Sequence, residues 1–431
     1  MKKNILYVII SLVVIGIVGG LIYIGLRNLI VKPDEPDKPI NPIVIDGNSD
    51  FDFKIIKQTQ SYYNQNYMIS PLSIAYAFTI LKEGAKENTL KELNDVIGNY
   101  QLPKAFAVKN KISIANLLFI NTTYKNDISE DYIKTIQNTY GSDLLFDQMR
   151  SPEKINNWIS DKTFKMIPKA LNQISPDLVM GIANAIAIDV EWNYKFECTN
   201  TYTEDFTKED KTKMEVAMMH QTDGAKYIEN KNAKGIIKDY AIYDRTTGEI
   251  VYEENNNTIA LEYIAIRPNT TVHEYISLLD KNELNDLLGT KKSPDEKTEI
   301  KYALPKYKYD FDYKRVQDAL QSLGMNDVFN PGVANLKGLV KDNSKLNLYV
   351  DEVIHKSHIE VSEDGTKAAA VTIIMVKDAA FHMTEEKKVY EVKFDKPFIY
   401  IIKEKNSDNI WFFGTVYEPM KAEDNKNCGY N

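Results

Sequence analysis

The side chains best suited to acid–base or metal chemistry in this chain are five histidines. They are His220, His273, His355, His358 and His382. His355 and His358 fall in a strand-like run, where residues three apart project to opposite faces, so we do not expect them to share a metal ion. No His-Glu-x-x-His, phosphate-loop or Gly-x-Ser-x-Gly motif is present. We therefore predict no metal, no cofactor and no enzymatic activity, while a serine hydrolase triad assembled from distant residues stays open.

A more informative stretch runs from Glu363 to Val376 and reads EDGTKAAAVTIIMV. Its even positions from 366 onward are all uncharged, whereas Lys367 and the following Lys377 both fall on odd positions. This alternation and the β-branched residues predict a strand that could lie within a covered sheet. Yet the stretch follows a complete strand-like run, Lys345–Val361, and precedes a polar run, Lys377–Lys388, with the composition of an exposed loop. The stretch therefore has the composition of a strand but the position of a loop.

The opposing interpretation of this stretch is a helix. Ala368–Ala370 alone would favour one, because alanine has the highest helix propensity. The β-branched residues among Val371–Val376 oppose a helix, and Gly365 indicates a turn just before. A strand is therefore the better prediction.

The stretch from Glu363 onward resembles the hinge of the reactive-centre loop in the serpin family, and further motifs similar to that family's follow in its order. They are Asn66-Tyr-Met-Ile-Ser-Pro-Leu-Ser-Ile74, Asn184 eight residues before Trp192, Leu304-Pro-Lys306, Leu323-Gly324-Met325, Asp327-Val-Phe329, His355-Lys356, Phe394-Asp-Lys-Pro-Phe398 and Phe413-Gly414. Each motif alone is weak, but together they run from about Phe51 to Pro419.

The resemblance implies an α+β serpin fold with a large mixed central β-sheet, further sheets, about eight or nine helices and a mobile reactive-centre loop. It implies a prokaryotic-type suicide-substrate inhibitor of a serine protease, or of a cysteine protease; the N-terminal sequence considered below adds a membrane anchor to this prediction. Such an inhibitor traps the acyl-enzyme when its cleaved loop inserts into the central sheet. The alternative function is a non-inhibitory surface binding protein with the same fold.

The resemblance also implies which residues form the hinge and the cleaved bond. The hinge would comprise Glu363, Gly365, Thr366, Ala368, Ala369, Ala370 and Thr372. Counting on from Gly365 with the family's usual spacing gives Ala379 and Ala380 as the reactive bond. Lys377, Phe381 and Met383 are alternatives, because the downstream part of the loop is longer than usual.

Two further groups follow from the same resemblance. Ser70, Asn184 and His355 would form a polar cluster beneath the point where the central sheet opens. Lys306 would pair with Glu363 at the top of that sheet. From the sequence alone, His355 reads equally well as a core histidine with its hydrogen bonds satisfied.

The N-terminus carries an apolar run, residues 4–26, preceded by two lysines and long enough to span a bilayer as a helix. It is longer than the apolar part of a signal peptide and lacks a small-x-small cleavage site. We expect an uncleaved single-pass anchor in the cell membrane with the following domain on the extracellular face. Secretion after signal cleavage is the alternative.

The predicted organisation has five parts. A short tail (1–3) precedes the anchor (4–26), and a Pro- and Asp-rich tether (27–50) follows it. One large domain (51–419) and a polar C-terminal tail (420–431) complete the chain. No Gly/Ser- or Pro-rich linker or internal repeat divides the large domain.

Composition and net charge indicate which classes of partner the protein binds. The 431 residues are 43% hydrophobic, and the net charge of −8 comes from interspersed charges, which argues against nucleic acid binding. The expected partners are a target protease and, through residues 4–26, the lipid bilayer, with the chain a monomer. Cys198 and Cys428 cannot build a disulfide framework, and whether they pair stays open.

The elements that must position these residues are predicted from periodicity and turn signals. Ser70 is the expected N-cap of a helix reaching Leu81. Further helices are expected from Asn88 to Ile97 and from Tyr313 to Leu323, closed by Gly324, and strand-like runs span Lys111–Ile120, Ile182–Trp192, Ile300–Phe311, Val389–Lys403 and Asn409–Tyr417. An added hairpin is expected within Ile228–Asn257.

Overall fold

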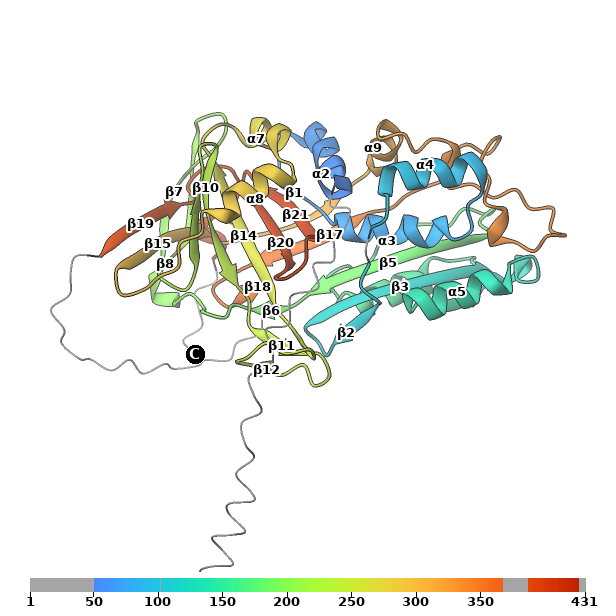
Figure 1. The fold of residues 1–431 in the computed structure, drawn as a ribbon, viewed down its shortest axis with the longest axis horizontal. Helices are drawn as coiled ribbons and strands as arrows, with labels where there is room; N and C mark the ends of the chain where they lie inside the picture. Colours follow the sequence, from blue (N-terminus) through green and yellow to red (C-terminus); the bar gives the residue numbers. More distant parts are fainter. Residues whose placement is uncertain (1–49, 101, 367–386, 426–431) are drawn as a thin grey trace, which may run out of the picture. The chain divides into compact units, whose positions relative to one another are not determined.

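The computed structural model describes residues 50–100, 102–366 and 387–425 (Figure 1), which belong to one compact unit. The predicted anchor at residues 4–26, its tether and loop residues 367–386 lie outside the described residues. Within the described ranges, no helix is long and apolar enough to cross a bilayer.

Eight α-helices lie in the described residues, most of them in the first half of the chain. They are α2 (Asp50–Lys57), α3 (Pro71–Lys82), α4 (Glu87–Ile97), α5 (Glu130–Tyr140), α6 (Glu153–Lys162), α7 (Val272–Leu278), α8 (Lys281–Gly289) and α9 (Val316–Ser322). Ser70 caps α3 as predicted, because its Oγ accepts a hydrogen bond of 3.1 Å from the Ser73 N–H. Gly324, with φ +108°, follows α9 as predicted.

Two sheets occupy the left-hand part of the described domain in Figure 1, where α7 and α8 also lie. The larger has six strands in the order β1 (Tyr67–Ile69), β21 (Ile410–Val416), β20 (Phe398–Glu404), β14 (Leu261–Pro268), β10 (Ala233–Asp239) and β9 (Lys226–Glu229). The other has four, in the order β19 (Lys388–Lys393), β15 (Thr298–Pro305), β8 (Lys213–Thr222) and β7 (Thr201–Thr207).

The central sheet has two halves, which are connected by a continuous stretch of backbone, residues 180–191. One half contains β2 (Phe106–Val108), β3 (Ile112–Asn121), β4 (Asp143–Asp147) and β5 (Met180–Ile188). The other contains β16 (Tyr307–Asp312), β17 (Lys356–Val361), β18 (Gly365–Thr366) and β6 (Val190–Glu191). Since β6 continues β5 after Asp189, the halves join at that point. The pair β3–β4 is parallel and β3–β5 antiparallel, so the sheet is mixed, as predicted.

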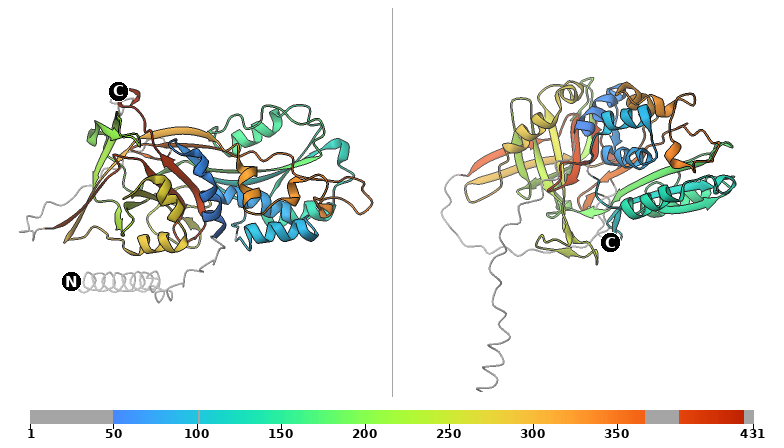
Figure 2. Two further views of the ribbon diagram at one scale, coloured as in Figure 1. Left: turned by 90° about the horizontal axis from the view of Figure 1, so that it is seen from above. Right: turned by 45° about the vertical axis from the view of Figure 1, so that its right-hand side comes forward.

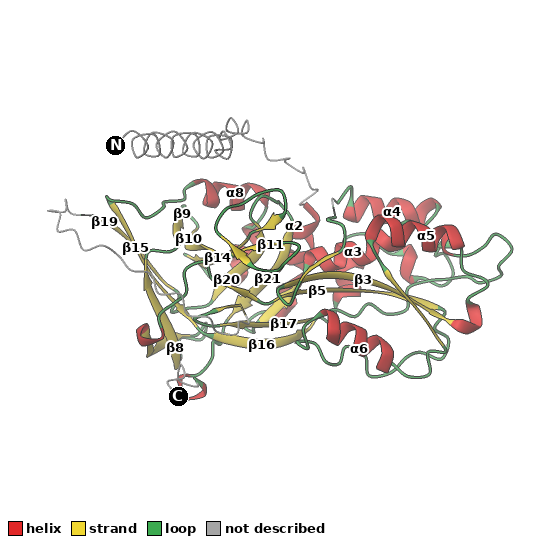
Figure 3. Cartoon of the chain, turned by 90° about the horizontal axis from the view of Figure 1, so that it is seen from below, coloured by secondary structure: helices red, strands yellow, loops and turns green. Residues whose placement is uncertain are grey.

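The two faces of β3 contact different layers, because alternate side chains of a strand point to opposite sides. Ile114 and Leu118 belong to the main core, whereas Leu117 and Phe119 pack with α6 residues such as Ile155. Helix α3 contacts the same sheet through β5. Figure 2 shows α3, α4 and α5 gathered around the long strands, and Figure 3 shows α6 beside them. The α+β class and the mixed central sheet predicted from the sequence are therefore confirmed.

Two strand predictions were wrong in extent. Of the run Lys345–Val361, only Lys356–Val361 forms a strand. Its neighbour β16 ends at Asp312, and beyond a single bond from the Tyr313 N–H to the His355 carbonyl at 2.8 Å the strand pairing stops, so residues 345–355 stay irregular. The run Ile300–Phe311 divides at Lys306 between β15 and β16, which belong to different sheets.

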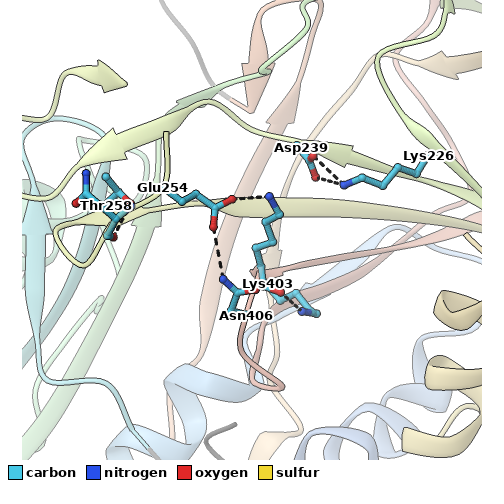
Figure 4. A network of polar contacts seen from close by, with 8 residues as sticks. Lys226, Asp239, Glu254, Thr258, Lys403 and Asn406 are labelled. Carbon is cyan, nitrogen blue, oxygen red and sulfur yellow. Dashed lines mark hydrogen bonds and ion pairs between the residues drawn. The ribbon is translucent and has the colours of Figure 1, made fainter. Parts of the chain in front are cut away.

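The insertion expected within Ile228–Asn257 is present as a small three-stranded sheet. Its strands are β11 (Ile242–Asp244), β12 (Ile250–Val251) and β13 (Thr258–Ile259). Its Glu254 contacts the turn after β20, where Oε1 lies 2.5 Å from Lys405 Nζ and Oε2 lies 3.5 Å from Asn406 Nδ2 (Figure 4). The insertion is thus fixed to the six-stranded sheet.

Candidate functional site

A gap between the two halves of the central sheet is the main feature of the candidate site. Within the described residues, β5 pairs with β3 alone, and the facing segment 345–355 forms no strand. A cavity of about 610 Å³ lies there. Its lining includes Ile182, Asn184 and Ile186 on one side and Leu348, Val350 and His355 on the other. The gap therefore has an unpaired strand edge and a largely apolar wall.

The predicted hinge begins at the closed end of this gap. Gly365 pairs with Glu191, and Thr366 pairs with both Val190 and Val361, so these two residues form β18 between β6 and β17. A Cβ on residue 365 would lie 2.1 Å from the Val190 carbonyl oxygen, which is why glycine is needed there. Within the described residues, Gly365 and Thr366 are thus the part of the predicted hinge that pairs in the sheet.

Thr366 faces the interior, as its position in the alternation predicted. Its side chain is 3% exposed, and its Oγ1 lies 2.6 Å from the hydroxyl of Tyr240. The ring of Tyr240 stacks on Trp192 with centroids 4.5 Å apart. A small polar residue fits here because its hydroxyl has a partner.

The turn before Gly365 is held by the segment that follows β6. The Trp192 N–H donates to the Asp364 carbonyl at 2.9 Å, and the Phe196 N–H donates to the Glu363 carbonyl at 3.0 Å. The indole N–H of Trp192 donates to the Ser362 carbonyl at 2.9 Å. These bonds fix where the hinge meets the sheet. We call residues 192–196 the anchor segment.

The expected ion pair at the top of the sheet is present. Lys306 Nζ lies 2.9 Å from Glu363 Oε2, and both side chains are nearly buried. The hydroxyl of Thr201 donates to Glu363 Oε1 at 2.9 Å, and Lys306 Nζ donates to Asn425 Oδ1 at 2.7 Å. The pair is therefore part of a polar network that includes the C-terminal tail.

The expected cluster of Ser70, Asn184 and His355 is only partly assembled. The Ser70 N–H donates to His355 Nε2 at 3.0 Å, while the Ser70 hydroxyl is used to cap α3. Asn184 bonds instead across β3, donating to Asn116 Oδ1 at 2.8 Å and to the Ala115 carbonyl. All three predicted residues line the cavity, but the hydrogen bonds of Asn184 go to β3 and those of Ser70 join His355 and α3. The expectation of one joined cluster was wrong.

Burial determines the charge state of His355. It lowers the pKa of His355 to about 4, because the charged imidazolium loses its hydration. The Nε2 atom that accepts from the Ser70 N–H must also be unprotonated. His355 is therefore a neutral hydrogen-bond acceptor at neutral pH.

Several predicted site residues lie outside the described residues. They are the hinge residues Ala368, Ala369, Ala370 and Thr372, the reactive-bond residues Ala379 and Ala380, and the alternatives Lys377, Phe381 and Met383. Cys198 is disulfide-bonded, and Cys428, the only other cysteine of the sequence, is also outside the described residues. In the part of the chain that is described, no group of three or more His, Cys, Asp or Glu residues could hold a metal ion.

Sequence reasoning missed three residues that contact the hinge or its ion pair. Tyr240, Thr201 and Asn425 each bond to them from a distant element. Tyr240 directly follows β10, in which residues 235–238 are all buried, so no alternation marks it. Nothing in the local sequence marks the other two.

The first prediction concerns the pH dependence of stability. Because the pKa of His355 is lower in the fold than in the unfolded chain, its contribution to stability is complete above about pH 6.5 and is lost as pH falls towards 4. His355→Gln keeps an acceptor for the Ser70 N–H but does not titrate. Between pH 7.5 and 4.5 the parent should lose about 2 kcal/mol more unfolding free energy in urea than the variant.

His358 provides the matched control, since it lines the same cavity but its Nδ1 pairs with Asp310 at 2.6 Å instead of accepting from Ser70. His358→Gln should leave the acid loss attributed to His355 in place. If His355→Gln and the parent lose the same free energy over this range, the assignment of that loss to His355 is wrong.

The comparisons with known proteins agree with this geometry. The family model described as Serpin (serine protease inhibitor) matches residues 46–419. An uncharacterized serpin-like protein of Methanosarcina acetivorans is 27% identical over 422 residues, covering 89% of this chain and 91% of the relative. A leukocyte elastase inhibitor of Xenopus laevis is 27% identical over 391 residues, covering 85% of this chain and 96% of the relative.

Solved structures give the same result. The native state of tengpin, a thermophilic serpin, is 31% identical with a TM-score of 0.69, covering 86% of this chain and 92% of that one. Its latent state is 28% identical with a TM-score of 0.66, covering 86% and 96%. The central sheet has a gap beside β5, and the hinge lies at the closed end of that gap. The family model also matches nearly all of the described residues. We conclude that the chain belongs to the serpin family.

Proposed function

We propose that this serpin is a suicide-substrate inhibitor of a serine protease, or of a cysteine protease. The observation that carries the proposal is the gap beside β5, with Gly365 and Thr366 already paired at its closed end. A strand that continued from Thr366 into this gap would run along the unpaired edge of β5. The small or uncharged residues at even positions after Thr366 suit the covered face of such a strand.

The inhibitory reaction begins as ordinary proteolysis. The nucleophile of the protease attacks the carbonyl carbon of Ala379, the peptide bond breaks, and Ala380 becomes a new N-terminus. The protease is now held as an ester or thioester on Ala379. Hydrolysis of that bond would release a cleaved inhibitor, so insertion of the loop must be faster than deacylation.

The energy of insertion comes from backbone pairing. About a dozen new hydrogen bonds, at roughly 0.5–1.5 kcal/mol each, release on the order of 10 kcal/mol before side-chain burial is counted. The acyl-linked protease is dragged along with the strand. Loss of a single oxyanion-hole donor slows deacylation by about 10²–10³-fold, which is enough to trap the complex. Inhibition therefore rests on kinetic trapping.

The names of relatives support an elastase-type target. Leukocyte elastase inhibitors of Xenopus laevis and Xenopus tropicalis are each 27% identical to this chain. Proteases of this type accept small residues, and Ala379 is small. We further propose that residues 4–26 anchor the inhibitor in the cell membrane with its domain on the extracellular face; the long apolar run supports this.

The position of the cleaved bond is testable by mass spectrometry. Incubation with an elastase-type protease should give a complex that survives denaturing electrophoresis, and a released fragment that begins at Ala380. A fragment beginning at Asp378 would identify Lys377 as the recognised residue. Fragments beginning at His382 or Thr384 would identify Phe381 or Met383. Any of these three would overturn the Ala379 assignment.

Breaking the ion pair should loosen the top of the sheet. Glu363→Lys places two ammonium groups together in a nearly buried site, and breaking a buried pair costs about 3–5 kcal/mol. We expect this variant to form chains of linked molecules on mild heating, because one molecule's loop can pair with another's open edge. The measurement is native electrophoresis with size-exclusion chromatography.

A nearby pair on β17 supplies the control. Glu360→Lys breaks the exposed contact with Lys308, where Oε2 and Nζ are 2.8 Å apart. It should stay monomeric under the same heating. Equal behaviour of the two variants would show that the Glu363 pair has no special role in keeping the sheet closed.

Thr366→Arg tests insertion itself. The guanidinium would have to occupy the buried site of Thr366 beside Tyr240, and an unpaired buried charge costs several kcal/mol. Since only two residues pair in β18, the variant should fold with its hinge displaced. It should be cleaved at the parent's bond but released as a plain substrate, with no stable complex and no gain in thermal stability after cleavage.

Thr366→Val is the matched control, because it loses the Tyr240 contact but adds no charge. It should still trap protease. An arginine variant that traps protease as well as the parent would contradict the insertion mechanism. In that case the non-inhibitory surface binding protein becomes the better description.

A further inference from the structure

Lys238 is a buried lysine with no part in the mechanism described so far. It lies on β10, opposite Tyr263 of β14, and its side chain is 0% exposed. Lysine is almost never fully buried unless its amine has partners. Its position therefore calls for an explanation in terms of what the amine holds.

The Lys238 amine has three hydrogen-bond acceptors. Nζ lies 2.6 Å from the Tyr194 carbonyl oxygen, 2.8 Å from Gln221 Oε1 and 2.8 Å from the Tyr302 hydroxyl. The Tyr302 hydroxyl donates its own proton to Gln221 at 2.6 Å, so towards Lys238 it is an acceptor. An ammonium group has three N–H donors, and each therefore has a partner here.

Three aromatic rings surround the same nitrogen. Nζ is 4.5 Å from the ring centroid of Phe196 and 5.4 Å from those of Trp192 and Tyr302. Burial lowers the pKa of Lys238 well below its usual value, while the ring faces and the three acceptors favour the charged amine. None of the three acceptors is a carboxylate.

These contacts join three parts of the protein at one atom. Lys238 belongs to the six-stranded sheet. Gln221 lies on β8 and Tyr302 lies on β15, and both of these strands belong to the four-stranded sheet. Tyr194 lies in the anchor segment, between Trp192 and Phe196. Those two residues donate the backbone hydrogen bonds that hold the hinge carbonyls of Asp364 and Glu363. The Lys238 amine therefore holds, through its hydrogen bond to Tyr194, the same segment that holds the hinge.

We propose that Lys238 is a positioning residue for loop insertion: it fixes the anchor segment against both sheets, so that the hinge enters the gap in one place and one register. This inference rests on the proposed inhibitory function. With the amine removed, the Tyr194 carbonyl and Gln221 would lose a buried partner and the anchor segment would loosen. Insertion would then be slower at its first step, and more of the acyl-enzyme would hydrolyse before it is trapped.

The test compares Lys238→Met with a matched lysine on the neighbouring strand. Lys226 lies on β9, and its Nζ pairs with the carboxylate of Asp239 at 2.8 Å (Figure 4), whereas the anchor segment bonds to the backbone carbonyl of Asp239, through the Asn193 N–H at 3.0 Å. Lys226→Met therefore removes a lysine of the same sheet. Tyr302→Phe keeps the ring but removes one acceptor, and it supplies a milder variant should Lys238→Met fold poorly. Thermal unfolding checks that each variant is folded.

Two quantities are measured on the full chain. In Lys238→Met, hydrogen exchange of the Trp192 and Phe196 amides should be about tenfold faster, because local opening becomes easier. The number of inhibitor molecules used per trapped elastase-type protease should rise about twofold or more, with the rate of loop cleavage unchanged, because slowed insertion competes with deacylation. Tyr302→Phe should change both in the same direction by less, and Lys226→Met should change neither.

The outcomes separate this inference from the function it rests on. A parent protein that traps no protease overturns the proposed function and this role with it. If the parent traps protease, an unchanged stoichiometry or unchanged amide exchange in Lys238→Met overturns the role of Lys238 alone. Equal changes in Lys226→Met overturn it too, since they would show a general effect of weakening the sheet.

Discussion

The unpaired backbone edge of β5 is the constraint on which the rest of this structure depends. Buried N–H and carbonyl groups need partners, and an unmade hydrogen bond inside a protein is unfavourable. In the described residues, β5 has a partner on one side only, and a cavity lies on the other. A fold with such an unpaired edge has a higher free energy than the same fold with one additional strand paired to that edge. The edge can therefore stay unpaired only while other contacts around the gap keep the sheet from rearranging.

Those contacts are few and directional. At the closed end, Gly365 and Thr366 lie between β6 and β17, and the Lys306–Glu363 pair covers the turn above them. Further along the gap, the neutral ring of His355 joins β17's side of the sheet to the start of α3 through Ser70. Apolar packing alone could not fulfil this role, because it would be regained equally well after the sheet rearranged. Hydrogen bonds to fixed acceptors distinguish one arrangement from another.

The sequence predicted the class of the fold and the inward position of Thr366, since motif order and alternation are local properties of a chain. It could not predict that residues 345–355 would stay irregular. Their composition suits a strand, but a strand needs a neighbouring strand to pair with, and β16 ends at Asp312. Asn184 was grouped with Ser70 and His355 by the resemblance alone, which carries no information on its hydrogen bond across β3 to Asn116. The partners Thr201 and Asn425 depend on contacts between residues far apart in the chain, which leave no periodic signal.

The position of the hinge also determines the register of any strand that follows it. Alternation has a period of two, so a slip of one residue would turn Lys367 towards the interior and the small residues towards solvent. Gly365 opposes such a slip, because the Val190 carbonyl leaves no room for a side chain at that position. Trp192 and Phe196 oppose it from the other side by holding the carbonyls of Asp364 and Glu363. Accuracy at the first two residues is therefore sufficient to align the whole strand.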